Sequence, residues 1–226
     1  MPQGEDGRAD GPIQVCGDDT LGVAFDDPVM CQAVAAQLRQ SGVWLETVAG
    51  IDRVVVHFDA LTTSMDAARS DLAASVQKLS TRTAMQTSLI EIPVCYGGEF
   101  GPDLDALCTT LGLSAEQLIE FHVATEYRVD MLGFTPGFAY VGGLPDELNV
   151  PRLAQPRLRV AAGSIGIADG RSGLYAMPGP GGWPLIGRTP MRLFDPAADQ
   201  PFVLHAGTRI RFHAIDADEF RQPVGQ

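Results

Sequence analysis

Apolar residues along the first hundred positions recur at two different spacings, one typical of strands and one typical of helices. Short segments rich in valine and other β-formers predict strands at 21–25, 43–48, 53–58 and 88–96. Helical spacing predicts helices over 28–40, opened by Asp26, Asp27 and Pro28, and over 65–79, capped by Ser64. The resulting order of strand, helix, strand, strand, helix, strand is that of the ferredoxin-like split arrangement.

A second pattern begins near residue 100. Two short helices are expected at 103–111 and 115–124, the second with a capping box formed by Ser114 and Gln117. From Tyr127 onward, glycine and proline make up 25 of the 94 residues of 133–226, against 16 of the 132 before. Short strands joined by tight turns predict a small barrel or sandwich, with strands at 166–168, 174–177, 184–186, 202–204 and 209–214.

These patterns give an α+β chain in four parts. The polar residues 1–12 are expected to be a flexible start, 13–98 a ferredoxin-like α/β sandwich domain, 99–125 a helical connection and 126–226 the β domain. The start lacks the apolar stretch of a signal peptide, and no apolar run approaches the about 18 residues of a membrane helix. A cytoplasmic protein without membrane contact is therefore expected.

Charge is distributed unevenly along the chain. The formal net charge is −12, but residues 1–132 hold 20 acids and 7 bases, whereas residues 133–226 hold 8 acids and 9 bases. The acidic excess disfavours a nucleic-acid partner, because like charges repel the phosphate backbone. A small anionic ligand is expected to prefer the second part.

Two kinds of site are not indicated by the sequence. The only lysine, Lys78, does not follow a glycine-rich turn, so no P-loop is present. The four cysteines and four histidines lack metal-ligand spacing, so no metal site is expected.

The first candidate for binding is the segment Pro151-Arg-Leu-Ala-Gln-Pro-Arg-Leu-Arg159, in which Arg152 and Arg157 each follow a proline. Proline stiffens each turn, and the guanidinium fork suits carboxylate or phosphate oxygens. The alternative is that these arginines pair with acidic groups of the same protein.

The second candidate is Met177-Pro-Gly-Pro-Gly-Gly-Trp183, which leads to Arg188. Gly181 and Gly182 can leave backbone N–H groups open to a ligand, and Trp183 offers a flat apolar wall with one donor. The alternative is a tight hairpin with a packed tryptophan.

Aromatic side chains supply a third candidate. Phe134, Phe138 and Tyr140 alternate and share one face of an extended segment, which Pro136-Gly137 interrupts. They form either core or the wall of a cleft. His122 lies on a predicted helix, where a hydrogen-bonded structural histidine is the plainer interpretation. Without a complete catalytic set, the chain is expected to donate half of a site to a partner.

Several motifs, taken in order, resemble one family. They include Gly133-Phe-Thr-Pro-Gly-Phe-Ala-Tyr140, the two Pro-Arg pairs, Tyr175, Pro-Gly-Gly-Trp183 and Ile186-Gly-Arg-Thr-Pro190, with Pro93-Val-Cys-Tyr-Gly-Gly98 upstream. The string is similar to the KipI-like, or allophanate hydrolase subunit 1, family, which includes the B subunit of bacterial 5-oxoprolinase. The resemblance covers about residues 20–215.

The resemblance implies a cyclophilin-like β-barrel for 126–226 and a KipA-like, or allophanate hydrolase subunit 2, partner. With a possible LamB/YcsF-like third subunit, such a complex opens 5-oxo-L-proline to glutamate with ATP and Mg at the level of the complex. The amide oxygen is then phosphorylated before water attacks. In that chemistry Arg152, Arg157 and Arg188 would hold carboxylate or phosphate oxygens, Gly181 and Gly182 would donate N–H groups, and His122 would handle a proton.

The family also leaves two other functions open. One relative inhibits a sensor histidine kinase, which would make this chain a regulatory binding module. A related domain pair occurs in urea amidolyase, which would make it a component of urea carboxylation or of the allophanate pathway.

Overall fold

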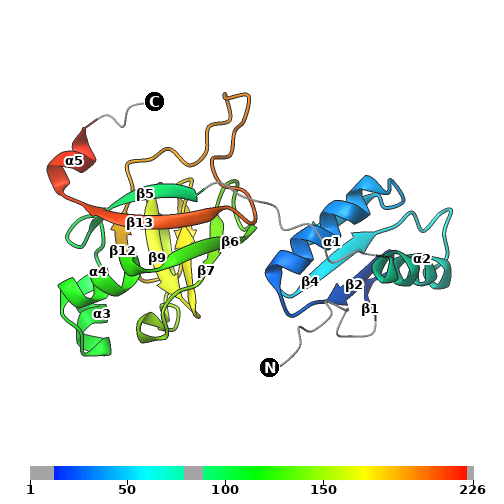
Figure 1. Cartoon of the computed structure of the whole chain (residues 1–226), viewed down its shortest axis with the longest axis horizontal. Coiled ribbons are helices and arrows are strands. Elements are labelled where there is room, and N and C mark those ends of the chain that lie inside the picture. The colour runs from blue at the N-terminus through cyan, green and yellow to red at the C-terminus, as the bar shows by residue number, and fades with distance from the viewer. Residues whose placement is uncertain (1–12, 79–88, 223–226) are drawn as a thin grey trace, which may run out of the picture. The chain divides into compact units, whose positions relative to one another are not determined.

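The computed structural model describes residues 13–78 and 89–222, and the chain divides into two compact units, 1–86 and 87–226 (Figure 1). Each unit has its own hydrophobic core. Within the described ranges, no helix combines the length and the apolar composition needed to cross a membrane.

The first unit is an antiparallel sheet with two helices, α1 (Pro28–Gln40) and α2 (Met65–Gln77). Both helices begin where the sequence predicts, because the side chain of Asp27 accepts the N–H of Val29 and that of Ser64 accepts the N–H of Ala67. The sheet has four strands in the spatial order β1 (Gln14–Gly17), β2 (Thr20–Ala24), β4 (Arg53–His57) and β3 (Glu46–Ala49).

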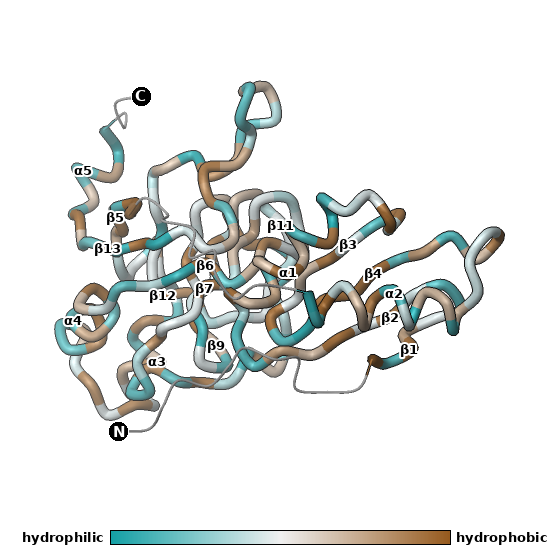
Figure 2. Tube along the Cα trace, turned by 45° about the vertical axis from the view of Figure 1, so that its right-hand side comes forward, coloured by the Kyte–Doolittle hydropathy of each residue, from teal (hydrophilic) through white to brown (hydrophobic). Residues whose placement is uncertain are grey.

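The core of the first unit lies between this sheet and the helices. Val54 and Val56 of β4 are fully buried, and β4 is coloured hydrophobic along much of its length (Figure 2). Leu38 of α1 and Leu72 of α2 belong to the same buried cluster. Alternate residues of the strand and one stripe of each helix thus close this core.

One predicted strand lies in the other unit. The segment expected to complete the first sheet forms β5 (Leu89–Tyr96), which pairs in parallel with β13 (Arg209–Ile215) through seven residues. Its Ile92 and Val94 are fully buried in the barrel. The described part of the first unit therefore has the order strand, strand, helix, strand, strand, helix. The fourth strand of its sheet is β1, which was not predicted, and the predicted split order is corrected.

The second unit is built on a closed barrel, so the prediction of an α+β chain with a C-terminal barrel is confirmed. Two further strands, β8 (Arg157–Val160) and β11 (Gly179–Gly181), pair antiparallel in a separate ribbon. Besides β5 and β13, the barrel contains β6 (Glu126–Leu132), β7 (Ala139–Gly142), β9 (Ser164–Ala168), β10 (Arg171–Leu174) and β12 (Leu185–Arg188).

Helices α3 (Leu104–Leu111) and α4 (Ala115–Ala124) form as predicted, and α4 has the expected capping box. Their apolar residues, including Leu107 and Leu118, pack into the barrel core. The predicted boundaries at 98 and 125 therefore both lie inside the second unit.

Two short helices complete the described part of this unit. The 3-10 helix η1 (Asp146–Leu148) precedes the arginine segment, and α5 (Ala217–Arg221) follows β13. Two predicted strands differ from the structure. Strand β10 ends at Leu174, where 174–177 was expected to be extended, and Phe202 makes only an isolated bridge with Phe194.

Candidate functional site

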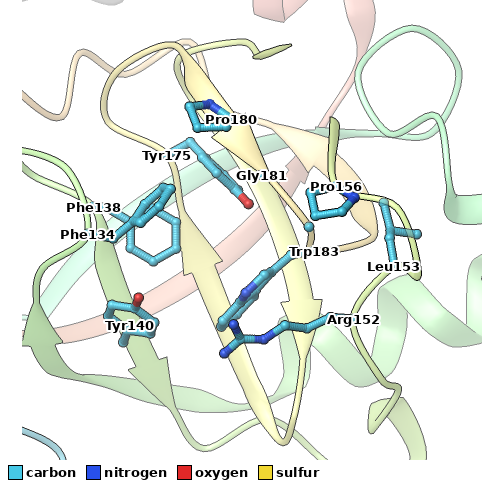
Figure 3. Close-up of a pocket in the computed structure, with 11 residues that line it drawn as sticks. Phe134, Phe138, Tyr140, Arg152, Leu153, Pro156, Tyr175, Pro180, Gly181 and Trp183 are labelled. Atoms are coloured by element: carbon cyan, nitrogen blue, oxygen red, sulfur yellow. The ribbon is translucent and has the colours of Figure 1, made fainter. Parts of the chain in front are cut away.

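A cavity of about 240 Å³ lies beside the β8–β11 ribbon (Figure 3). It gathers most of the residues that the sequence singled out, from three separate segments of the chain. Four further lining residues, Leu153, Pro156, Tyr175 and Pro180, were not predicted as site residues, although Tyr175 belongs to the family motif. The predicted residues in the lining are Phe134, Phe138, Tyr140, Arg152, Gly181, Gly182 and Trp183.

Aromatic rings form the walls. Phe138, Tyr175 and Trp183 are almost fully buried. Phe138 packs edge-to-face on Tyr140 at 4.8 Å, on Tyr175 at 4.9 Å and on Trp183 at 6.0 Å between ring centroids. Edge-to-face packing fixes each ring against its neighbour. The contacts between the rings therefore order the walls, which lowers the entropy cost of binding a small flat molecule.

The turn before β7 brings Phe134 to the mouth of this cavity. Gly137 has φ +77°, and a Cβ there would lie 2.8 Å from the Cβ of Ala176. Phe134 itself has φ +66°, a left-handed conformation that is costly for a bulky residue, by about 1–3 kcal/mol. The residue is 60% exposed, and its ring meets Phe138 edge-to-face with centroids 5.5 Å apart. The predicted interruption at Pro136-Gly137 thus does direct an aromatic side chain to a cleft.

Arg152 supplies positive charge at the cavity. Its Nε donates to Oδ2 of Asp169 at 2.9 Å, and its Cζ lies 5.7 Å from the ring centroid of Trp183 (Figure 3). Asp169, at φ +51°, sits in the Asp-Gly turn that joins β9 and β10. Both Nη groups of Arg152 lack a hydrogen-bond partner among the described residues. They can therefore bind a carboxylate as a fork.

Gly181 is required by the close approach of Tyr175. A Cβ at 181 would lie 2.5 Å from the Tyr175 hydroxyl oxygen and 2.8 Å from Cγ2 of Val160. Burial raises the pKa of the Tyr175 hydroxyl, although a hydrogen bond with the Trp183 backbone acts in the opposite direction. The hydroxyl is therefore neutral at pH 7 and can serve as a polar contact deep in the cavity.

Arg157 does not reach this cavity. Its Nη2 donates to Oδ1 of Asp103 at 2.6 Å, and Oδ2 of Asp103 accepts the N–H of Leu185 at 2.7 Å. The other terminal nitrogen of Arg157, Nη1, is buried without a partner among the described residues. Arg157 therefore pairs with an acidic group of the same protein, which was the alternative to ligand binding. The contact connects β8 to the start of α3 and to β12.

Arg188 lies in a different place again. Its Nε donates to the carbonyl of Ala162 at 2.7 Å, and its Cζ lies 5.8 Å from the ring centroid of Phe220. It lines a second cavity, together with Ala176 and Phe220. The three arginines of the sequence motif thus have three separate environments.

His122 is fully buried in the barrel and does not line the aromatic cavity. Its Nδ1 is 2.7 Å from the Tyr96 hydroxyl oxygen, and its ring stacks on Phe212 with centroids 4.5 Å apart. Burial lowers the pKa of His122 from 6.5 to about 3. This placement supports a neutral structural histidine and gives no support to the predicted proton-transfer role.

The chemistry available in the cavity is limited to binding. Its lining contains one charged side chain and no carboxylate, histidine, cysteine or serine. Among the residues that the structure describes, no group of three or more His, Cys, Asp or Glu could hold a metal ion. The cavity can therefore orient a small anionic molecule, but a base or nucleophile has to come from elsewhere.

Comparison with known proteins places this chain in a family. The model of the carboxyltransferase domain, subdomain C and D, matches residues 12–204. The 5-oxoprolinase B subunit of Escherichia coli O157:H7 is 51% identical over 127 residues, which span 56% of this chain and 58% of that protein. The 5-oxoprolinase B subunit of Bacillus subtilis (strain 168) is 32% identical over 226 residues, with 92% of this chain and 94% of that protein covered.

Solved structures agree with the fold. The conserved uncharacterized protein PH0987 from Pyrococcus horikoshii is 38% identical, with a TM-score of 0.57 over 92% of this chain and 99% of that one. The urea amidolyase of K. lactis has a TM-score of 0.74 over 92% of this chain and 15% of that one, and its 16% identity shows a shared fold alone. The match over residues 12–204 and the full-length relative show that this chain belongs to the carboxyltransferase-domain family of subdomains C and D, in the group whose curated members are named as the B subunit of 5-oxoprolinase.

Proposed function

We propose that this chain is a subunit of an ATP-dependent 5-oxoprolinase and that it binds 5-oxo-L-proline in the aromatic cavity. One observation carries the proposal. The cavity combines ordered aromatic walls with the open guanidinium fork of Arg152, in a chain 32% and 51% identical to proteins named as the 5-oxoprolinase B subunit.

The chemistry of the ligand fits these walls. 5-Oxo-L-proline is a flat five-membered lactam with one carboxylate. Its ring can lie against Trp183 while its carboxylate meets the Nη groups of Arg152. The volume of about 240 Å³ is below the about 300 Å³ at which pockets for drug-sized ligands begin, as a ligand of this size needs. Tyr140 and Gly182 also line the cavity, so that the Tyr140 hydroxyl and the Gly182 N–H would contact the lactam amide.

The reaction requires groups that the cavity lacks. The lactam oxygen attacks the γ-phosphorus of ATP and ADP leaves. Water then adds to the activated ring carbon and the C–N bond breaks. A second water releases phosphate, so that glutamate, ADP and phosphate are formed. This chain orients the lactam and shields it from bulk water.

The remaining groups are assigned to partners. We propose that a KipA-like, or allophanate hydrolase subunit 2, protein supplies the base that activates water, and that Mg enters with ATP in the assembled complex. The absence of acid–base residues from the lining of this cavity supports a shared site. A LamB/YcsF-like third subunit would complete the assembly.

A pull-down of the tagged full chain from its own cell lysate tests this proposal. Recovery of a KipA-like subunit in about equal amount supports the shared site. Recovery of a sensor histidine kinase would instead favour the regulatory binding module, and a co-purifying biotin carboxylase would favour a urea carboxylase component. Either of these results contradicts the proposal.

A further inference from the structure

A second cavity of about 370 Å³ lies at the ends of β9 and β12 in the second unit. Its lining includes Arg188, Thr189, Arg192 and Phe220 and contains no acidic side chain. Tyr175 lines the aromatic cavity, and the next residue, Ala176, lines this one. One segment of backbone therefore contributes to both cavities.

Arg188 is held in place by contacts that leave its terminal nitrogens open. Its Nε donates to the carbonyl of Ala162 at 2.7 Å, and its Cζ lies 5.8 Å from the centroid of Phe220. The Phe220 ring is itself packed on Phe100 at 4.4 Å. Across the part of the chain that the structure describes, neither Nη group of Arg188 has a hydrogen-bond partner. The guanidinium is thus fixed in position but still available to a ligand.

Two further donors line the same cavity. The hydroxyl oxygen of Thr189 accepts the N–H of Met191 at 3.2 Å, so its own proton remains to be donated, and Thr189 is buried. Arg192 pairs through Nη1 with Oδ2 of Asp195 at 2.8 Å and is otherwise exposed. Arg188 therefore carries most of the uncompensated charge, and Arg192 adds a second, partly neutralised guanidinium.

We propose that this second cavity binds the phosphate chain of a nucleoside diphosphate or triphosphate. The two guanidinium groups of the segment 188–192, together with the hydroxyl donor of Thr189, suit a ligand with several anionic oxygens better than a single carboxylate. The cavity is also larger than the one assigned to the lactam. The identification of the ligand as a nucleotide rests on the proposed function, which consumes ATP, and the chain has no P-loop to hold the phosphates elsewhere.

Calorimetric titration of the full chain with ADP, at low and at moderate salt, tests the proposal. Arg188→Ala is expected to weaken ADP binding at least tenfold, and Arg192→Ala about threefold, because Asp195 already neutralises part of its charge. Arg188→Lys should lose less than Arg188→Ala. Arg159, an exposed arginine of β8 that lines neither cavity, provides the matched control, and Arg159→Ala should leave ADP binding unchanged.

Specific results would overturn the assignment. They are absence of ADP binding by the full chain, unchanged binding in both Arg188 variants, adenosine binding as tightly as ADP, and inorganic pyrophosphate binding as tightly as ADP. The first two exclude this phosphate site, the third excludes recognition through phosphate, and the fourth excludes a nucleotide as the ligand.

Titration with 5-oxo-L-proline separates this inference from the proposed function. Arg188→Ala should leave lactam binding unchanged, since Arg188 does not line the aromatic cavity. If ADP binds as described but the lactam does not bind, the phosphate site stands and the proposed function fails. If the assembled complex turns over the lactam while Arg188→Ala leaves the KM for ATP unchanged, the proposed function stands and the phosphate site fails.

Discussion

In the proposed function, Arg152 is the residue on which lactam recognition depends most. Its ion pair with Asp169 and its position over Trp183 orient the guanidinium without occupying its Nη groups. A ligand carboxylate therefore meets a fork whose orientation is already set, so little side-chain entropy is lost on binding.

We predict that Arg152→Ala raises the KM for 5-oxo-L-proline about 10- to 100-fold with little change in kcat, because one charge-assisted hydrogen-bonded pair contributes about 1.5–3 kcal/mol. Steady-state kinetics of the assembled enzyme measure this. Arg159→Ala serves as control and should behave as the wild type. A KM for the Arg152 variant equal to that of the control would contradict the carboxylate contact.

Gly181 and Gly182 form a matched pair for testing the shape of the cavity. We expect Gly181→Ala to lower the melting temperature by several degrees and to weaken lactam binding, since its Cβ would overlap the Tyr175 hydroxyl and Val160. Gly182→Ala should have a much smaller effect on stability, because the nearest atom to its Cβ is 3.5 Å away on Pro156. Thermal unfolding of both variants gives the comparison, and equal losses would contradict it.

His122 makes stability depend on pH. Its pKa is lowered to about 3 in the folded chain, so the unfolded chain, with a value near 6.5, binds the proton more readily. Above about pH 6.5 His122 is neutral in both the folded and the unfolded chain, so its titration does not reduce the free energy of unfolding. As the pH falls from 6.5 toward 3, protonation of the unfolded chain lowers the free energy of unfolding by about 1.4 kcal/mol per pH unit. His122→Phe should remove this component from the pH slope of the unfolding free energy. Identical slopes in denaturant titrations between pH 6.5 and 4.5 would be inconsistent with it.

At the scale of elements, the contact between Asp103 and Arg157 connects three parts of the second unit. Asp103 precedes α3, Arg157 begins β8, and the second carboxylate oxygen of Asp103 binds the N–H of Leu185 at the start of β12. The β8–β11 ribbon that carries Gly181 is thereby attached to the barrel. Arg157 acts on the cavity through this attachment and not by touching a ligand.

We predict that Asp103→Asn lowers the unfolding free energy by about 2 kcal/mol, because it leaves the partly buried Arg157 without its counter-charge. Adding Arg157→Met should restore part of the loss in a double-mutant cycle. Glu126→Gln, at the exposed ion pair with Arg209, is the control and should lower the unfolding free energy much less, because solvent screens that pair. If Asp103→Asn lowers the unfolding free energy no more than Glu126→Gln does, the ion pair between Asp103 and Arg157 does not stabilise the fold.

Local signals predicted the helices well. The caps at Asp27, Ser64 and Ser114 are formed by side chains that bond to nearby backbone, so neighbouring residues are sufficient to locate them. The partner of a strand depends instead on distant residues. The residues of β5 predict a strand on their own. Only the pairing of this strand with β13, about 120 residues away, places it in the barrel.

The difference between local and distant contacts also explains which of the predicted site residues the structure brings together. The aromatic residues and glycines of the motifs do line one cavity, because each motif forms a short local unit. The three arginines look alike in sequence, yet their partners Asp169, Asp103 and the Ala162 carbonyl lie 17, 54 and 26 residues away. Local reasoning therefore could not separate Arg152 from the other two.

For the whole molecule, the division of charge seen in the sequence does not carry over to the two units. Both cavities lie in residues 133–222, but the second unit also contains the acidic residues between 87 and 132, so that it holds 16 acids and 10 bases against 12 acids and 6 bases in residues 1–86. Attraction of an anionic ligand therefore depends on the arginines that line each cavity and not on the net charge of the unit. In the proposed function, the cavities bind and orient the ligands, and the partner completes the chemistry.

The most direct test of the central claim is the amount of glutamate formed per ADP by the tagged full chain, isolated with its partners and supplied with 5-oxo-L-proline and Mg-ATP. The account predicts one glutamate per ADP, formation of both that depends on the lactam, and loss of both at low lactam concentration in the Arg152→Ala complex. No glutamate from a complex that contains the KipA-like subunit, or formation unaffected by Arg152→Ala, would contradict it.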